Sequence, residues 1–200
     1  SLGGDQVFEA AGNMEAADFQ SMGGDSALAM FDTIGAESAV GLEGDQLAGM
    51  FGAMDGDQLH SIGEDQLFDT VGGMTQDNFA SLDSDSAFGM FDAMGSDMAL
   101  NMGGDQLAGM FGAMEASQMA ALRSEAIAMA VDKMEFQDFV MMDGESAFGM
   151  METMGIDSAM TLAGDQMAGM FAAMDNNHIH DMGSERSFEA VSYTHLRAHE

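Results

Sequence analysis

Acidic side chains recur at intervals of twenty residues along this chain. The series is Asp5, Asp25, Asp45, Asp65, Asp85, Asp105, Glu125, Glu145, Asp165 and Glu185. Carboxylate oxygens are the ligands that Ca²⁺ and Mg²⁺ prefer in proteins. If the copies stack in register, these acids form a column whose mutual repulsion divalent cations would relieve. The chemistry that the spacing offers is therefore collective, weak cation binding, and the six aspartates that we assign to it are Asp25, Asp45, Asp65, Asp85, Asp105 and Asp165.

The acids do not follow the pattern of an EF-hand calcium loop. A loop that starts at Asp55 would place Leu59 at its fifth position and Gln66 at its twelfth. An EF-hand needs an oxygen ligand at the fifth position and a bidentate Glu at the twelfth. Cation binding is thus expected to be diffuse, without a fixed stoichiometry.

Residue sets typical of a catalytic centre are absent from the sequence. The chain has no Cys, no phosphate-binding loop with a Lys, and no distinctive pair of carboxylates. His178 and His180 form the one histidine cluster, but residues two apart point to different sides of a helix. Methionine can ligate Cu(I), yet nearly all of the 25 methionines fall in apolar stripes, where they fill a core. We expect no enzymatic activity and no cofactor beyond Ca²⁺ or Mg²⁺.

The charge of the chain favours basic partners. Its 35 acidic residues outnumber four basic ones, for a formal net charge of -31. Nucleic acids are not expected as partners, because affinity for phosphates comes largely from Lys and Arg, and an anionic membrane surface would repel the chain. No apolar run approaches the roughly 18 residues of a membrane span. The absence of Cys excludes disulfides but does not choose a compartment.

The elements that position the acids read as two helices per copy. Each copy thus has two modules, a longer and a shorter one, and each module is one predicted helix with its N-cap. Each module begins with a capping-type residue, followed by any residue, an acid, a polar residue and an apolar one. Asp or Thr falls at the predicted N-cap in five modules, at Asp55, Thr75, Asp83, Asp143 and Asp175. The acid then lies at the second helical position, at the positive end of the helix dipole. Gln or Ser follows at the third position, as in a capping box.

Apolar residues of the longer module follow helical spacing. Leu47, Met50, Phe51 and Met54 fall at i, i+3, i+4 and i+7, which is one helical face. Helices of about seven and eleven residues are marginal alone, because isolated helices need about 12–15 residues. They must be stabilised by stacking on their neighbours. The sequence therefore predicts an all-α fold, an α-solenoid of about ten 20-residue repeats; a β-solenoid is the alternative, since Gly-Asp turns at fixed spacing also occur there.

No linker interrupts the repeat, so we expect a single array over residues 1–190. DQLAGMFGAM at 45–54 recurs at 105–114, which indicates a superperiod of sixty residues. The copy at 115–134 is the least regular. Its stripe of apolar residues is expected to slip out of the regular register, to Ile127, Met129 and Val131. Residues 191–200 break the repeat and resemble the translation of a transposase adapter from sequencing libraries. We expect the native array to extend beyond both ends.

Stripped to its cap, acid, polar and apolar positions, the repeat resembles bacterial tandem short-helix arrays. DGDQL at 55–59 and GGDQL at 103–107 carry the resemblance, which extends to the N-terminal domain of MgtE-type magnesium transporters and to TAL-effector repeats. This chain differs from both in having no Pro and a strict period of twenty. The transporter resemblance implies Mg²⁺ binding through acidic side chains. TAL-effector repeats read DNA, which the negative charge of this chain disfavours.

These observations predict a non-enzymatic acidic repeat protein, an interaction or structural array on the surface of a microbe or secreted by it. Its protein partner is not specified by the sequence. The alternative is a cytoplasmic cation-sensing domain that regulates a transporter. The sequence does not decide the compartment, although an extracellular location is slightly favoured.

Overall fold

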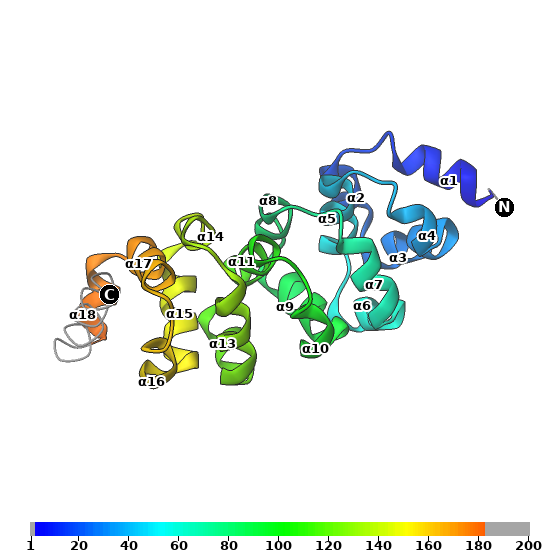
Figure 1. Cartoon of the computed structure of the whole chain (residues 1–200). Coiled ribbons are helices and arrows are strands. Elements are labelled where there is room, and N and C mark those ends of the chain that lie inside the picture. Colours follow the sequence, from blue (N-terminus) through cyan, green and yellow to red (C-terminus); the bar gives the residue numbers. More distant parts are fainter. Residues whose placement is uncertain (1–2, 183–200) are drawn as a thin grey trace. The chain divides into compact units, whose positions relative to one another are not determined.

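We describe residues 3–182 of a computed structural model of the chain, in which the helices of the tandem copies succeed one another (Figure 1). The described residues contain helices and no strand, so the all-α prediction is confirmed and the β-solenoid alternative is wrong. Nine copies lie in this range, whereas Glu185 and the segment 191–200 lie outside it. The chain divides into two compact units, Ser1–Met102 and Gly103–Glu200. That boundary falls within the continuous register of the repeat, and a single array over 1–190 stays a prediction.

Each copy folds into a longer helix followed by a shorter one. The longer helices are α1 (Gly4–Ala11), α3 (Gly24–Ile34), α5 (Gly44–Gly52), α7 (Glu64–Val71), α9 (Ser84–Met94), α11 (Gly104–Ala113), α13 (Ser124–Lys133), α15 (Gly144–Met154) and α17 (Gly164–Ala173). The shorter helices are α2 (Ala16–Met22), α4 (Ala36–Ala39), α6 (Gly56–Ile62), α8 (Gln76–Ala80), α10 (Ser96–Ala99), α12 (Ala116–Ala121), α14 (Phe136–Val140), α16 (Ile156–Ala159) and α18 (Asn176–Asp181).

Helix starts follow the predicted pattern of a capping residue, an acid and a polar residue. All five predicted side-chain caps accept a backbone N–H bond in the first turn, namely those of Asp55, Thr75, Asp83, Asp143 and Asp175. Such caps stabilise a helix by about 1 kcal/mol each. They define the starting residue of helices that are too short to be stable alone.

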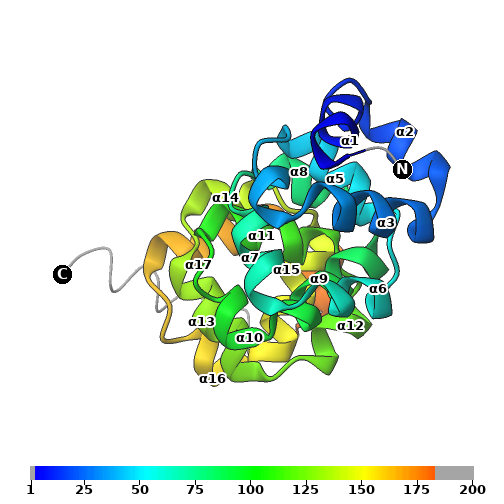
Figure 2. The same ribbon diagram turned by 90° about the vertical axis from the view of Figure 1, so that its right-hand side faces the viewer.

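The short helix of one copy packs on the long helix two copies further along. This contact joins α2 to α5, α4 to α7 and α6 to α9 in the first unit, and α12 to α15 and α14 to α17 in the second. The helices α6 and α9 lie side by side in both views (Figure 1 and Figure 2). Adjacent copies are also in contact, as in α3 with α5 and α15 with α17. Within each unit, stacking therefore couples copies to their second neighbours as well as to their first.

A glycine in the middle of the long helix makes room for this second-neighbour contact. A Cβ atom built on Gly49 would lie 2.6 Å from the Cα and the carbonyl oxygen of Ala16, the first residue of α2. A Cβ on Gly89 would lie 3.1 Å from the Cα of Gly56 at the start of α6. One on Gly169 would lie 2.9 Å from the carbonyl oxygen of Phe136. The two helices approach closely because no side chain separates them.

Polar side chains at the third helical position also span two copies. Nε2 of Gln46 donates to the carbonyl oxygens of Ala11, Gly12 and Met14, while its Oε1 accepts from the backbone N–H of Glu43. Gln166 makes the same three carbonyl contacts with residues 131, 132 and 134. The predicted capping-box residue thus caps its own helix and also bonds to the end of the helix two copies earlier. Within the described residues, no buried side-chain N or O lacks a partner.

The superperiod of sixty residues has a structural counterpart. In the second, fifth and eighth copies, the long helix reaches 11 residues and the short helix has four. A glycine joins the two helices directly, at Gly35, Gly95 and Gly155, with φ of 77°, 71° and 79°. This left-handed region suits glycine. The other short helices have five to seven residues, so the predicted length of about seven is an upper value.

The core is built from the predicted apolar stripes. Phe51, Met50 and Met54 are buried, as are the equivalent residues of most other copies. In α13 the predicted slip of the stripe is wrong: Met129 is 57% exposed, and the buried face continues through Ala130 and Val131 in regular register. Met129 occupies the position at which Gly49 and Gly89 make their close contacts.

Substitution of Gly49 by Ala tests the close approach of α2 and α5. We expect the free energy of unfolding to fall by about 1–3 kcal/mol, because the new methyl group meets backbone atoms that have no space to yield. Urea unfolding followed by circular dichroism measures the change.

Gly52→Ala is the matched control in the same helix. A Cβ there would meet only the Cδ2 atom of Leu82, at 3.4 Å. This variant is expected to be neutral or stabilised by up to about 1 kcal/mol, the helix-propensity gain. A Gly49→Ala protein as stable as Gly52→Ala would contradict the close contact.

Candidate functional site: acidic helix starts and an acidic hollow

The six aspartates assigned to cation binding lie at the second position of six different long helices. Each of them is exposed. Within the described part of the chain, no group of three or more His, Asp or Glu side chains is arranged to hold a metal ion. The structure therefore distributes these carboxylates over separate helix starts, and the cation assignment stays a prediction of collective behaviour.

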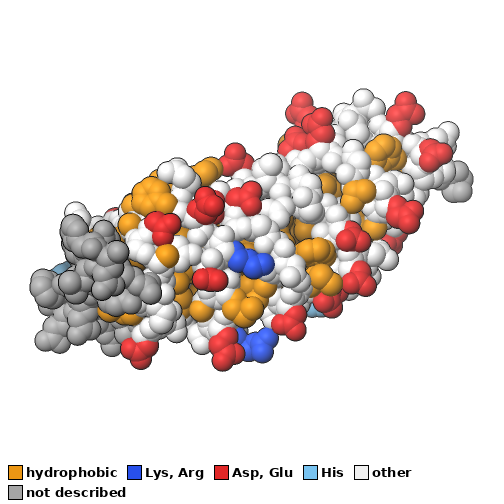
Figure 3. All heavy atoms as spheres, viewed as in Figure 1, with side chains coloured by type: hydrophobic (Ala, Val, Ile, Leu, Met, Phe, Trp, Pro, Cys, Tyr) orange, Lys and Arg blue, Asp and Glu red, His pale blue; other side chains and the backbone are white. Residues whose placement is uncertain are grey.

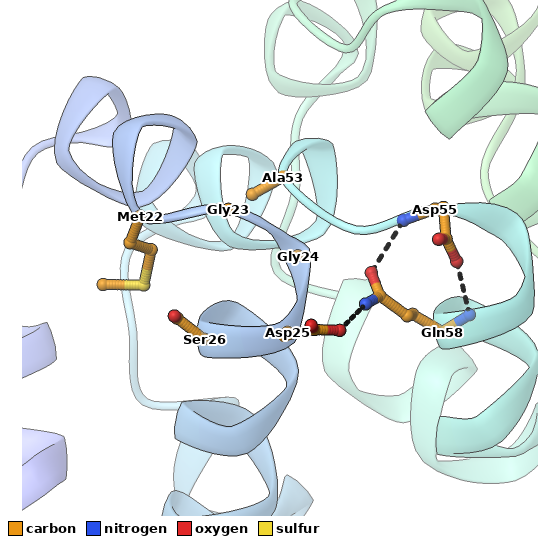
Figure 4. Close-up of a pocket in the computed structure, with 8 residues that line it drawn as sticks. All are labelled: Met22, Gly23, Gly24, Asp25, Ser26, Ala53, Asp55 and Gln58. Atoms are coloured by element: carbon orange, nitrogen blue, oxygen red, sulfur yellow. Dashed lines mark hydrogen bonds between the residues drawn. The ribbon is translucent and has the colours of Figure 1, made fainter.

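We call the acid of the twenty-residue series, at the second position of each long helix, the head acid of its copy. Asp25 shows what a head acid contacts. Nε2 of Gln58 in α6 donates to Oδ1 of Asp25 in α3 at 2.8 Å (Figure 4). The same Gln58 caps its own helix, because its Oε1 accepts from the backbone N–H of Asp55 at 3.0 Å. These residues line a pocket of about 400 Å³. A head acid is thus tied to the short helix of the next copy.

His178 repeats this contact near the other end of the chain. Its Nε2 atom lies 3.3 Å from Oε1 of Glu145, the head acid of α15. Gln58 and His178 each lie 33 residues after the acid that they contact, so they hold equivalent positions. The ring of His178 also lies 5.3 Å from that of Phe148, between centroids. This packing gives His178 a structural role at the junction of α15 and α18.

A larger hollow lies among α3, α4 and α7. It has a volume of about 970 Å³, and the residues that line it include Asp32, Glu37, Asp65 and Asp69. Phe31, Ile34 and Val40 contribute apolar surface. Asp69 stands at the position where Gly49 allows α2 to approach α5, so the α4–α7 contact carries a carboxylate where the α2–α5 contact carries a glycine. Of the six assigned aspartates, Asp65 is the one in this hollow.

Sequence reasoning missed the three acids that join Asp65 there. Asp32, Glu37 and Asp69 come from three different helices, and their separation along the chain does not follow the twenty-residue period. A signal was present at Asp69, where an acid replaces the glycine found at the equivalent place in several other copies. Its meaning depends on the second-neighbour packing of the helices, which the repeat period alone does not give.

Acidic side chains lie on the surface of the described residues. None of its Asp or Glu side chains is buried. Figure 3 shows acidic side chains spread over the face in view, among hydrophobic ones. The helices of the described range include none with both the length and the apolar character needed to cross a membrane. The chemistry available on this surface is attraction of cations and of basic groups.

Comparison with known proteins gives no match among family models, curated proteins or solved structures. Functional inference therefore depends on the residues themselves.

The carboxylate of Asp175, which caps α18, accepts from two backbone N–H groups. The hydrogen bond from the backbone N–H of His178, reinforced by that of Asn177, holds the pKa of Asp175 below its ordinary value. We expect carbon-13 NMR to show this carboxyl titrating below about 3.9, the usual value for aspartate. A lowered folded pKa means that the stabilisation is complete above the unfolded pKa and is lost as the pH falls through the folded pKa.

His178→Gln separates the causes, since it keeps the backbone N–H and removes the imidazole. The pKa of Asp175 should stay low in this variant, because the backbone bond is the largest cause. Titration of the wild-type Asp175 carboxyl at an ordinary aspartate pKa would refute this description of the cap.

Proposed function

We propose that this chain is a non-enzymatic acidic repeat protein that serves as an interaction or structural array on the surface of a microbe or secreted by it. Divalent cations bind diffusely among its carboxylates, and its protein partners present basic surfaces. The observation that carries this proposal is the exposure of the acids: no Asp or Glu in the described residues is buried. Exposed carboxylates are available to cations in solution and to basic groups of partners.

The high net charge supports the same proposal. A charge of -31 repels other copies of the chain and attracts basic proteins over long range. Such attraction acts mainly on the association rate and on selectivity. Each acid stabilises the start of its own helix. Together the acids generate the negative electrostatic field around the array.

A second candidate is a cytoplasmic cation-sensing domain that regulates a transporter. The hollow favours it, because four acidic residues, Asp32, Glu37, Asp65 and Asp69, are among those that line one concave surface. Isothermal titration with Mg²⁺ distinguishes the two candidates. A saturable site of defined stoichiometry that is lost in Asp69→Asn supports the sensor, whereas weak uptake without a defined stoichiometry supports the array.

Cations are expected to stabilise the fold. The midpoint of thermal unfolding, followed by circular dichroism, should rise when millimolar Mg²⁺ or Ca²⁺ replaces a chelator, through screening and weak binding. Monovalent salt at equal ionic strength should give a smaller rise. A midpoint indifferent to divalent ions and to monovalent salt alike would remove the cation part of the proposal.

Neutralising the hollow should reproduce part of this effect without cations. The variant Asp32→Asn, Glu37→Gln, Asp69→Asn removes like charges that share one surface, so its midpoint in chelator should exceed that of the wild type. Its further gain from Mg²⁺ should be smaller. Three neutralised acids on separate helices of the second unit, Glu125→Gln, Asp157→Asn and Asp181→Asn, provide the control with equal charge.

A further inference from the structure

An exposed apolar surface on α14 and on its C-cap residue, Met141, departs from the rest of the array. Phe136 is 37% exposed, Val140 is 44% exposed and Met141 is 59% exposed. Phe136 and Val140 are four residues apart and share one face of the helix. Phe139, which lies between them in the sequence, is fully buried and anchors α14. We call the three exposed side chains the α14 patch.

The other copies do not have this patch. The equivalent three residues are Ala16, Gln20 and Ser21 in the first copy, and Gly56, His60 and Ser61 in the third. No other described copy carries a large apolar residue at all three positions. The packing of the array therefore does not require them. The helix α14 contacts α17 as α2 contacts α5, through the close approach of Phe136 to Gly169.

The charge of the segment that carries the patch favours a cationic partner. The segment 132–145 holds five acids, Asp132, Glu135, Asp138, Asp143 and Glu145, and one basic residue, Lys133. A second copy of a chain with a net charge of -31 would bring further negative charge to this face. A cationic partner would meet the opposite charge of this segment as well as the apolar surface of the patch, and protein interfaces commonly combine the two.

We propose that the α14 patch docks a cationic amphipathic helix of a partner protein. The partner's apolar face covers Phe136, Val140 and Met141, and its Lys or Arg side chains lie against the surrounding carboxylates. An amphipathic helix fits because its apolar residues recur at the spacing that a short helical ridge can contact. Met141 suits such a partner, since methionine side chains repack readily against varied apolar surfaces. This inference rests on the proposed function, for which it names a surface and a partner class.

Two labelled peptides test the proposal with the full chain. Both contain the same Lys, Leu and Ala residues; in one the leucines form a single helical face, and in the other they are scattered around the helix. Fluorescence anisotropy measures the Kd of each at fixed ionic strength. The wild-type chain should bind the amphipathic peptide about tenfold more tightly than the scattered one, because burial of a few apolar side chains contributes to binding that peptide alone.

The variant Phe136→Ala, Val140→Gln, Met141→Ser gives the α14 patch the residues of the first copy, where α2 makes the equivalent packing contact. It should fold as the wild type by circular dichroism, lose the tenfold preference and bind the scattered peptide unchanged. Val40→Gln, which removes a 49% exposed apolar side chain in the first unit, should keep the preference.

Each outcome is decisive. Retention of the preference in the triple variant overturns the assignment to α14. Equal, salt-dependent binding of both peptides to the wild type overturns the docking site and leaves the proposed acidic array intact. Absence of binding to either peptide at low salt overturns both. Dimerisation of the wild type, but not of the triple variant, in sedimentation equilibrium would assign the patch to a second copy and also overturn the proposal.

Discussion

The fold depends on the close contact between a short helix and the long helix two copies further along. Each of these helices is too short to persist alone. At α2–α5 the backbones approach so closely that Gly49 has space only for hydrogen, and at α6–α9 a Cβ on Gly89 would lie 3.1 Å from the Cα of Gly56. The third-position side chains Gln46 and Gln166 then bond across the same two-copy interval. Helix caps define where the helices begin, but this contact determines how they assemble.

Much of this could be read from the sequence, because caps and apolar stripes are local. Asp55 and Asp83 cap as predicted, since a side chain three residues from an amide needs no tertiary context. The two-copy interval was missed, because a strict repeat gives the period but not which neighbours touch. Gly49, Gly89 and Gly169 offered a signal: glycine in mid-helix costs about 1 kcal/mol relative to Ala, so its recurrence indicates a close contact.

The same packing determines where chemistry is possible. Apolar side chains and glycines occupy the interhelical contacts, so the carboxylates at the second helical positions lie on the surface. Departures from the pattern have local consequences. Asp69, at the position of the contact glycine, lines the acidic hollow, and Phe136, Val140 and Met141 leave apolar surface exposed on α14. The regular positions build the scaffold, and the irregular positions are the candidates for specific recognition.

The second-neighbour contact is the central claim, and proton NMR tests it most directly. Gly56 and Gly89 belong to the third and fifth copies, and a Cβ built on Gly89 lies 3.1 Å from the Cα of Gly56. Selective labelling of the glycine α-carbons resolves their α-protons. Our account predicts a nuclear Overhauser effect between the α-protons of Gly56 and Gly89. Its absence, in a spectrum where α-protons of adjacent helices in neighbouring copies do give such effects, would contradict the account.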